Sequence, residues 1–260
     1  QQDQPSDPDR IPPVKDRIEL TDSYNNFWFD DGTQVARYNG EFRSSLLIDP
    51  PNGRMPAYTQ QAQERLRVAA ELRASRGAFA GPKSRPLAER CLMSFGSSSG
   101  PPMLPILYNN HYQIVQSPGY VMILVEMVHD ARIIRIDADP LPDAFRPWMG
   151  DSIAHWEGDT LVVRVSGQMP DTWFDRSGNH HSYEMVVEER WTATGADHVQ
   201  YEATITDPNT FTAPWTISFP LYRHVADNMQ LLEFKCAEFS EEFLYGEWRK
   251  PGTPRGNPPQ

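Results

Sequence analysis

The sequence predicts a mainly β protein, an antiparallel lipocalin-like (calycin-like) barrel with one N-terminal helix and long terminal extensions. Beyond residue 108, short runs of β-branched and aromatic residues are separated by tight turns such as Pro118-Gly119 and Glu157-Gly158-Asp159. One segment, between Thr59 and Gly77, places apolar residues at helical spacing. Closing such a meander removes exposed sheet edges, which favours a barrel over a sandwich.

The expected elements follow in order along the chain. Two short strands, at 24–29 and 43–49, precede the Pro50-Pro51 stop, because proline cannot donate to a strand ladder. Thr59 is expected to cap the helix, and Gly77 is expected to end it. The later strands are expected at 108–113, 121–128, 152–156, 160–165, 183–191, 199–206, 215–221 and 230–236.

The 260 residues are enough for one main domain with a sizeable core. We expect four segments along the chain. They are a flexible N-terminal segment (1–20), strands, a helix and a loop packing on the barrel (21–107), the barrel itself (108–248) and a flexible C-terminal tail (249–260).

Charge argues against several partners. The chain has 24 Lys and Arg against 35 Asp and Glu, a net charge of -11, so a nucleic acid backbone would be repelled. No apolar run approaches the roughly 20 residues that a membrane-spanning helix needs. A small-molecule ligand or substrate is the expected partner, and a homo-oligomer assembled through the proline-rich ends is a further possibility.

The polar start at residues 1–8 resembles the beginning of a mature exported protein, although a trimmed chain would look the same. The only cysteines, Cys91 and Cys236, have no CxxC neighbour that would suggest a zinc cluster. A disulfide between them is the simplest interpretation for an exported protein. Two buried free thiols are the alternative.

A base, an acid and a cation stand close together in His129-Asp130-Ala131-Arg132. If the preceding strand continues through them, His129 lies on the opposite face from Asp130 and Arg132. If they turn the chain, all three can converge at the barrel rim. As a functional site, His129 and Asp130 would be catalytic and Arg132 would hold an anionic group. A salt bridge beside a structural histidine is the alternative, and the sequence leaves both open.

Two other groups could complete the site. The first precedes the Pro118-Gly119 turn, and in it His111 and Tyr112 would be catalytic while Tyr108 and Asn110 would bind substrate. The second could flank a barrel mouth with titratable groups and tryptophan walls. Its members are Trp148, Asp151, His155 and Trp156, of which Trp156 is also explained by turn structure.

Metal and cofactor signals are weak. A further polar group is better explained as a solvated loop, because its spacing matches no metal motif. It comprises Asp171, Trp173, Asp175, His180 and His181. The sequence lacks P-loop, GxGxxG and CxxCH motifs, so we expect no cofactor and no metal.

Several segments resemble a family of uncharacterised exported proteins found in several copies in some environmental bacteria. The resemblance covers roughly residues 24–240. The segments that carry it include Tyr108-Asn109-Asn110-His111-Tyr112-Gln113-Ile114-Val115-Gln116, His129-Asp130-Ala131-Arg132, Trp148-Met149-Gly150-Asp151-Ser152 and Trp156-Glu157-Gly158-Asp159-Thr160-Leu161-Val162-Val163. The resemblance implies export to the periplasm or beyond, and it implies no activity. Relatives carry a histidine after the second cysteine where this chain has Ala237.

These features lead to two functional hypotheses. The first is an exported, cofactor-free enzyme that performs acid/base chemistry of the lyase, hydratase or isomerase type on a small aromatic or apolar molecule. The second is a non-catalytic carrier or surface protein that binds a hydrophobic ligand or a glycan.

Overall fold

The computed structural model describes residues 35, 37–38, 40–76, 81–82, 85–94, 100–106, 108–172, 175, 179–225 and 227–240. The strand expected at 24–29, the helix stop at Gly77, the side chain of Trp173 and both terminal extensions lie outside the described residues.

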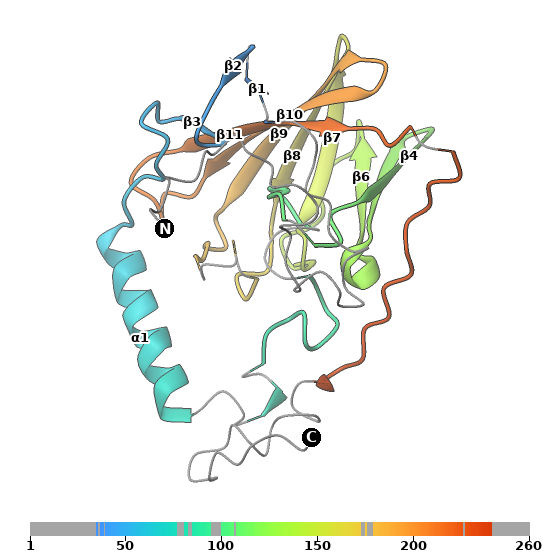
Figure 1. The fold of residues 1–260 in the computed structure, drawn as a ribbon. Coiled ribbons are helices and arrows are strands. Elements are labelled where there is room, and N and C mark those ends of the chain that lie inside the picture. Colours follow the sequence, from blue (N-terminus) through green and yellow to red (C-terminus); the bar gives the residue numbers. More distant parts are fainter. Residues whose placement is uncertain are drawn as a thin grey trace, which may run out of the picture.

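The described residues are mainly β-strands (Figure 1). The N-terminal elements are β1 (Arg37–Tyr38), β2 (Glu41–Phe42), β3 (Leu47–Asp49) and α1 (Gln60–Arg76). The later strands are β4 (Tyr112–Ser117), β5 (Tyr120–Val125), β6 (Ala131–Ile136), β7 (Asp151–Glu157), β8 (Thr160–Ser166), β9 (Val186–Gly195), β10 (His198–Thr206) and β11 (Trp215–Tyr222).

The main sheet is open, so the predicted closed barrel is wrong. Nine strands follow the order β3-β11-β10-β9-β8-β7-β6-β5-β4, and no ladder between described residues joins β3 to β4. The two edges differ in length. β3 has only three residues and ends at Pro50-Pro51, whereas β4 has six. The expected mainly β fold with one long helix is confirmed, and the N-terminal part of the chain adds β3 to the same sheet.

The predicted antiparallel meander has one exception, because β6 and β7 are parallel. Three predicted hairpins, β4-β5, β7-β8 and β9-β10, are antiparallel as expected, although β4 spans Tyr112–Ser117 rather than the expected 108–113. After β6 the chain returns along residues 137–150 before β7 starts in the same direction. Pro140, Pro142 and Pro147 lie in this return segment and exclude a ladder there.

The strand predicted at 230–236 does not form. The chain instead leaves β11 as an extended C-terminal strap, residues 223–225 and 227–240, which runs down the side of the sheet (Figure 1). The strap is instead held by the backbone N–H of Leu232, which donates to the carboxylate of Glu126 at 3.0 Å, and by its cysteine at position 236. Apolar alternation in this segment therefore does not lead to a ladder.

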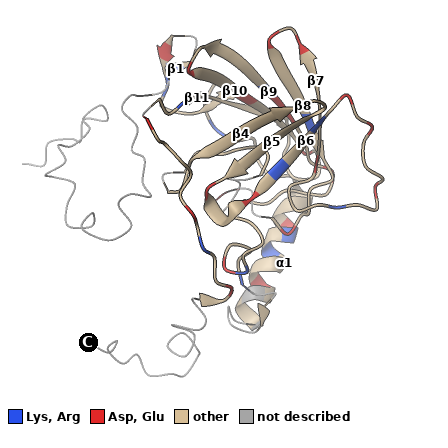
Figure 2. Ribbon diagram, turned by 90° about the vertical axis from the view of Figure 1, so that its right-hand side faces the viewer, with Lys and Arg blue, Asp and Glu red and all other residues tan. Residues whose placement is uncertain are grey.

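The strap is fixed by a disulfide between Cys91 and Cys236, which confirms the predicted pairing. Next to it, the backbone N–H of Phe239 donates to the carbonyl of Glu89 at 2.8 Å. The strap end is thus tied to the loop region that precedes the sheet, and Figure 2 shows the same course from a second direction.

The helix α1 confirms the predicted N-cap, since the hydroxyl of Thr59 accepts the backbone N–H of Ala62 at 3.1 Å. Ala62 is its buried residue, and most other side chains of α1 are exposed. Arg65 anchors the helix by donating to the hydroxyl of Thr210 at 3.0 Å. No described helix is long and apolar enough to cross a membrane.

Curvature of the sheet gives it a single core. Inward-facing residues from strands near both edges belong to one buried cluster, from Leu47 on β3 to Val121 and Ile123 on β5. Tyr201 and Val163, at the centre of the sheet, are fully buried in the same cluster. The concave face is therefore filled by side chains.

Removing the disulfide should destabilise the fold. The Cys91–Cys236 bond closes a loop of 145 residues, and losing such a cross-link costs about 2–5 kcal/mol. We expect a Cys91→Ser/Cys236→Ser double variant to have a correspondingly lower free energy of unfolding in urea. The control is the native chain with reductant, which should unfold like the variant. Equal stability of oxidised and reduced native chain would contradict this prediction.

Candidate functional site

The sheet has two different ends. At one end, tight turns join β4 to β5, β7 to β8 and β9 to β10. At the other, loop end, longer segments connect the strands (Figure 1). Buried polar and charged side chains gather in and near these loops. They include Asn109, Glu126, Asp130, Arg132, His181, Ser182 and Asp207.

The segment around His129 turns the chain, but the turn does not bring His129, Asp130 and Arg132 together at the rim of the sheet. Met127–His129 form a 3-10 turn in which Val128 and His129 have φ angles of 60° and 57°. β6 then begins at Ala131. Asp130 and Arg132 consequently point inward and are buried, while His129 is exposed. The three side chains do not converge.

Asp130 and His129 have separate surroundings. The carboxylate of Asp130 accepts the backbone N–H of Ser94 at 3.0 Å, which attaches the loop before the sheet to the start of β6. The ring of His129 lies edge-on to Phe234 of the strap, with centroids 6.2 Å apart. Asp130 thus has a structural contact, and His129 lies at the surface under the strap.

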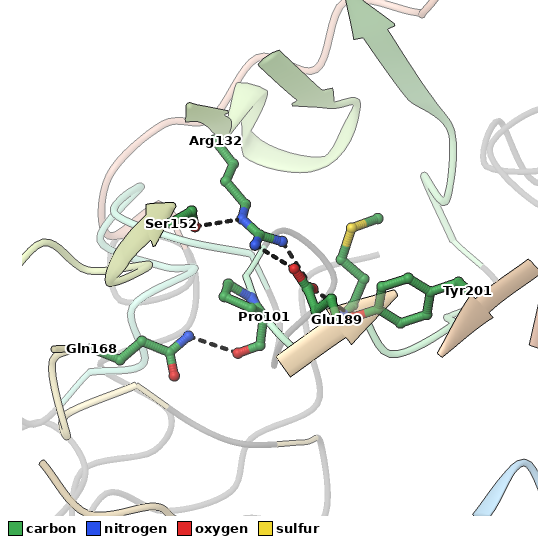
Figure 3. Close-up of polar contacts among 7 residues, drawn as sticks. Pro101, Arg132, Ser152, Gln168, Glu189 and Tyr201 are labelled. Atoms are coloured by element: carbon green, nitrogen blue, oxygen red, sulfur yellow. Dashed lines mark hydrogen bonds and ion pairs between the residues drawn. The ribbon is translucent and has the colours of Figure 1, made fainter. Parts of the chain in front are cut away.

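Arg132 forms the centre of a buried polar network (Figure 3). Its guanidinium donates through both terminal nitrogens to the carboxylate of Glu189, with one of these bonds at 3.0 Å, and through Nε to the hydroxyl of Ser152 at 3.0 Å. Arg132 is 2% exposed and Glu189 is fully buried. The donors of Arg132 therefore serve the fold, and they do not face a substrate anion.

Tyr201 extends this network to the loop that packs inside the sheet. Burial, and then the charge of Glu189, raise the pKa of Tyr201, so the phenol keeps its proton. It donates to Glu189 at 2.6 Å and accepts the backbone N–H of Met103 at 2.9 Å. Nearby, Gln168 donates to the carbonyl of Pro101 at 2.6 Å (Figure 3). The loop 100–106 is thereby held against the concave face.

Sequence reasoning missed Glu189. The signal was available, because Glu189 alternates with Val187 and Trp191 and so shares their inward face. A charged residue in an apolar alternation is the pattern that predicts a buried ion pair.

His111 and Glu126 form a group, among the residues that the structure describes, that combines a partly accessible histidine with a buried carboxylate. His111 Nδ1 lies 3.6 Å from Glu126 Oε2, and the two side chains are 17% and 2% exposed. The ring of His111 also packs on the exposed ring of His224, with centroids 4.7 Å apart. The site is assembled from the start of β4, the end of β5 and the strap.

The carboxylate of Glu126 is held by two neutral donors. Asn109 Nδ2 donates to it at 2.8 Å, and the backbone N–H of Leu232 in the strap donates at 3.0 Å. Asn109 adopts a left-handed φ of 49°, which asparagine tolerates well. The side-chain oxygens of Asn109 and Asn110 are buried and accept no hydrogen bond from a described residue. Such oxygens suit a ligand that can donate a hydrogen bond.

The two tyrosines of this segment are half-buried beside His111 in the sequence. Burial raises the pKa of Tyr112, which packs against the core. Tyr112 therefore stays protonated at neutral pH, and its hydroxyl can take part only in hydrogen bonds. Of the predicted residues, His111 lies beside Glu126, Tyr108, Asn110 and Tyr112 are its close neighbours in the sequence, and His129 does not join them.

The group around β7 forms a separate surface. Asp151 accepts Arg135 at 2.8 Å and the backbone N–H of Leu141 at 2.8 Å, which holds the return segment 137–150 to the sheet. His155 lies at the exposed turn end, 3.2 Å from Glu157. A hydrogen bond from Arg190, and a second from His155, lower the pKa of Glu157.

The two tryptophans do not wall a common cleft with these groups. Trp156 is 46% exposed near the Glu157-Gly158 turn, and Trp148 is half-buried in the return segment. Asp151, His155 and the two tryptophans thus lie at different places along the sheet and do not form the predicted barrel mouth.

The candidate metal group is also divided. His181 is buried, and its Nδ1 lies 3.0 Å from the carbonyl of Ser182, so Nδ1 carries the proton and Nε2 can accept from Thr172. Asp175 instead accepts the backbone N–H of Asn179 at 3.1 Å. Within the described parts of the chain, no group of three or more His, Cys, Asp or Glu side chains is arranged to hold a metal ion.

Comparison with known proteins found no match among family models, curated proteins or solved structures. The site is therefore interpreted from its own geometry.

Breaking the buried pair should cost much of the stability. Glu189→Gln leaves the guanidinium of Arg132 buried without its counter-charge, which costs about 3–5 kcal/mol. The measurement is urea unfolding followed by tryptophan fluorescence. The matched control is Glu64→Gln in α1, where the partner Arg67 is 56% exposed, and no measurable change is expected. A small effect of Glu189→Gln would contradict the buried pair.

His181 should make stability fall on mild acidification. Burial lowers the pKa of His181 in the fold, whereas the unfolded chain takes up a proton near pH 6.5. Stability is complete above that pH and falls as pH decreases toward the folded pKa. In His181→Gln this part of the loss should vanish, which urea unfolding at about pH 7.5 and about pH 5.5 would measure. His155→Gln, at an exposed histidine, is the control and should keep the native slope.

Proposed function

We propose that the protein is exported and performs acid/base chemistry of the lyase, hydratase or isomerase type on a small aromatic or apolar molecule. His111 would be the general base and Glu126 its orienting carboxylate. The observation that carries the proposal is the position of a partly accessible imidazole 3.6 Å from a carboxylate that is only 2% exposed. Histidine beside a carboxylate is a common acid/base arrangement, and its hydrogen bonds are often long before substrate binds.

Electrostatics support these roles. The charge of Glu126 is compensated by two neutral donors, Asn109 and the N–H of Leu232, with no described cation bonded to it. A carboxylate held in this way can orient the neighbouring imidazole of His111. The buried side-chain oxygens of Asn109 and Asn110 supply hydrogen-bond acceptors for a substrate.

The surroundings fit an apolar substrate. Leu232, 42% exposed, and Met229, 48% exposed, lie in the strap that crosses the site, and the ring of His224 covers one side of His111. An aromatic or aliphatic group could bind against these side chains without entering the core. Arg132 takes no part, since Glu189 and Ser152 occupy its donors.

Export is supported by the Cys91–Cys236 bond, because disulfides persist mainly in oxidising compartments. The resemblance to exported proteins points the same way.

The alternative function is a non-catalytic carrier. A lipocalin-like carrier would hold its ligand inside the sheet, but here the concave face is packed with a buried cluster that includes Tyr201 and Ile123. The loop end near His111 is the better place for a ligand. A carrier would bind there stoichiometrically and release no product.

The acid/base proposal can be tested with a generic probe of base catalysis. The probe is 5-nitrobenzisoxazole, a small aromatic compound that opens when a base removes the C3–H proton of its isoxazole ring, so that the N–O bond breaks and a coloured cyanonitrophenolate forms. We expect turnover above that of free imidazole at equal concentration. In His111→Gln it should fall about 100-fold, which is the usual contribution of a general base.

The matched control is His129→Gln, which removes an exposed histidine also in contact with the strap and should retain activity. Glu126→Gln should also lower turnover, because the imidazole loses its orienting carboxylate. Circular dichroism would verify that each variant is folded. Equal turnover by native chain and His111→Gln, or a loss specific to His129→Gln, would contradict the assignment.

A further inference from the structure

The longer edge of the sheet lacks the features by which sheet edges normally avoid association. β4 is a terminal strand paired only with β5. Its residues 113–117 are all exposed, although the strap runs nearby. No backbone hydrogen bond between described residues joins the strap to this segment. In the described part of the chain, the outer N–H and C=O groups of residues 113–117 are thus presented to solvent.

The sequence of this edge favours pairing. Sheet edges are usually protected by short length, proline, bulges or charged side chains, particularly lysine. β3, the opposite edge, is short and is followed by Pro50-Pro51. β4 reads Tyr-Gln-Ile-Val-Gln-Ser and contains neither proline nor charge, and Figure 2 shows its ribbon without acidic or basic residues along its length. In a chain with a net charge of -11, this is a neutral docking edge.

Both faces of the edge also expose apolar side chains. Ile114 pairs with Ile123 and therefore lies on the inner face, yet it is 48% exposed because no further strand extends the core beneath it. Val115, on the outer face, is 42% exposed. Because Ile114 faces inward yet remains about half exposed, a further strand paired with β4 would bury it.

We propose that a second copy of this chain supplies the missing strand, so that two β4 strands pair antiparallel and join two sheets into one. The occupant is favoured by symmetry. A two-fold axis that relates two antiparallel strands runs perpendicular to the sheet, so the inner faces of both copies lie on the same side. Inner residues then pair with inner residues, and the residue on the axis lies opposite the same residue of the other copy. The middle of β4 makes that residue Ile114 or Val115.

Either register is free of repulsion. Pairing about Ile114 sets Tyr112 opposite Gln116 of the other copy, and pairing about Val115 sets Gln113 opposite Ser117. In both, apolar residues fill the centre and neutral polar residues lie outside, with no like charges opposed. Position 111 then lies opposite position 117 or 119, so the β4-β5 turn of one copy comes next to the histidine of the other.

The first test is the mass of the full chain in solution by light scattering, at concentrations from about 1 to about 100 µM, the range of many reversible dimers. Twice the chain mass is expected. Ile114→Lys should give monomers, because charge at the pairing edge opposes association. The matched control is Ile133→Lys, at an isoleucine equally exposed (49%) but two strands inside the sheet, and it should stay dimeric.

The second test locates the axis. The described chain has no free cysteine, so Ile114→Cys and Val115→Cys each introduce a single thiol. In the pairing proposed here one of the two faces its own copy at about 5 Å between Cβ atoms and should form a covalent dimer on mild oxidation. Ile133→Cys should not. A native chain that is monomeric throughout, or a dimer that survives Ile114→Lys and crosslinks through neither edge position, would overturn the proposal.

Discussion

The buried ion pair between Arg132 and Glu189 is the interaction on which the arrangement of the sheet depends. It joins β6 to β9 across the concave face, with Ser152 on β7 and Tyr201 on β10 completing its hydrogen bonds. Desolvating two charges is costly, and such a pair is tolerated only when every donor and acceptor is used. Arg132 and Glu189 lie on β6 and β9, which are separated in the sheet by β7 and β8. The ion pair between them therefore holds the sheet in its curved form, which in a closed barrel the hydrogen bonds between the first and last strands would do.

This network also determines which polar groups at the loop end are used in structural contacts. Tyr201 holds Met103, Gln168 holds Pro101, and Asp130 holds Ser94, so the connections before β4 are anchored to the sheet by buried polar groups. The predicted acid and cation of the HDAR segment are thereby committed to structure. The polar groups left near solvent are those around His111, where the strap and the start of β4 meet.

Elements with local signals were predictable from the sequence. Turn residues such as Pro118-Gly119 located the hairpins, and Thr59 located the start of the helix. The remainder depended on distant contacts. The parallel register of β6 and β7 and the extended course of 230–236 both depend on contacts with distant segments, and alternation in one segment carries no information about those contacts.

The choice between the two histidines shows the same limit at the level of a single residue. His129 follows an apolar strand and precedes an acid, yet the left-handed φ angles at Val128 and His129 turn its ring outward. His111 lies in a less conspicuous sequence, but Glu126, fifteen positions later on the neighbouring strand, is brought to its ring by the β4-β5 register. Since β4 also forms the free edge, addition of a strand there would alter the exposure of His111, and association and acid/base chemistry would then share one element of the fold.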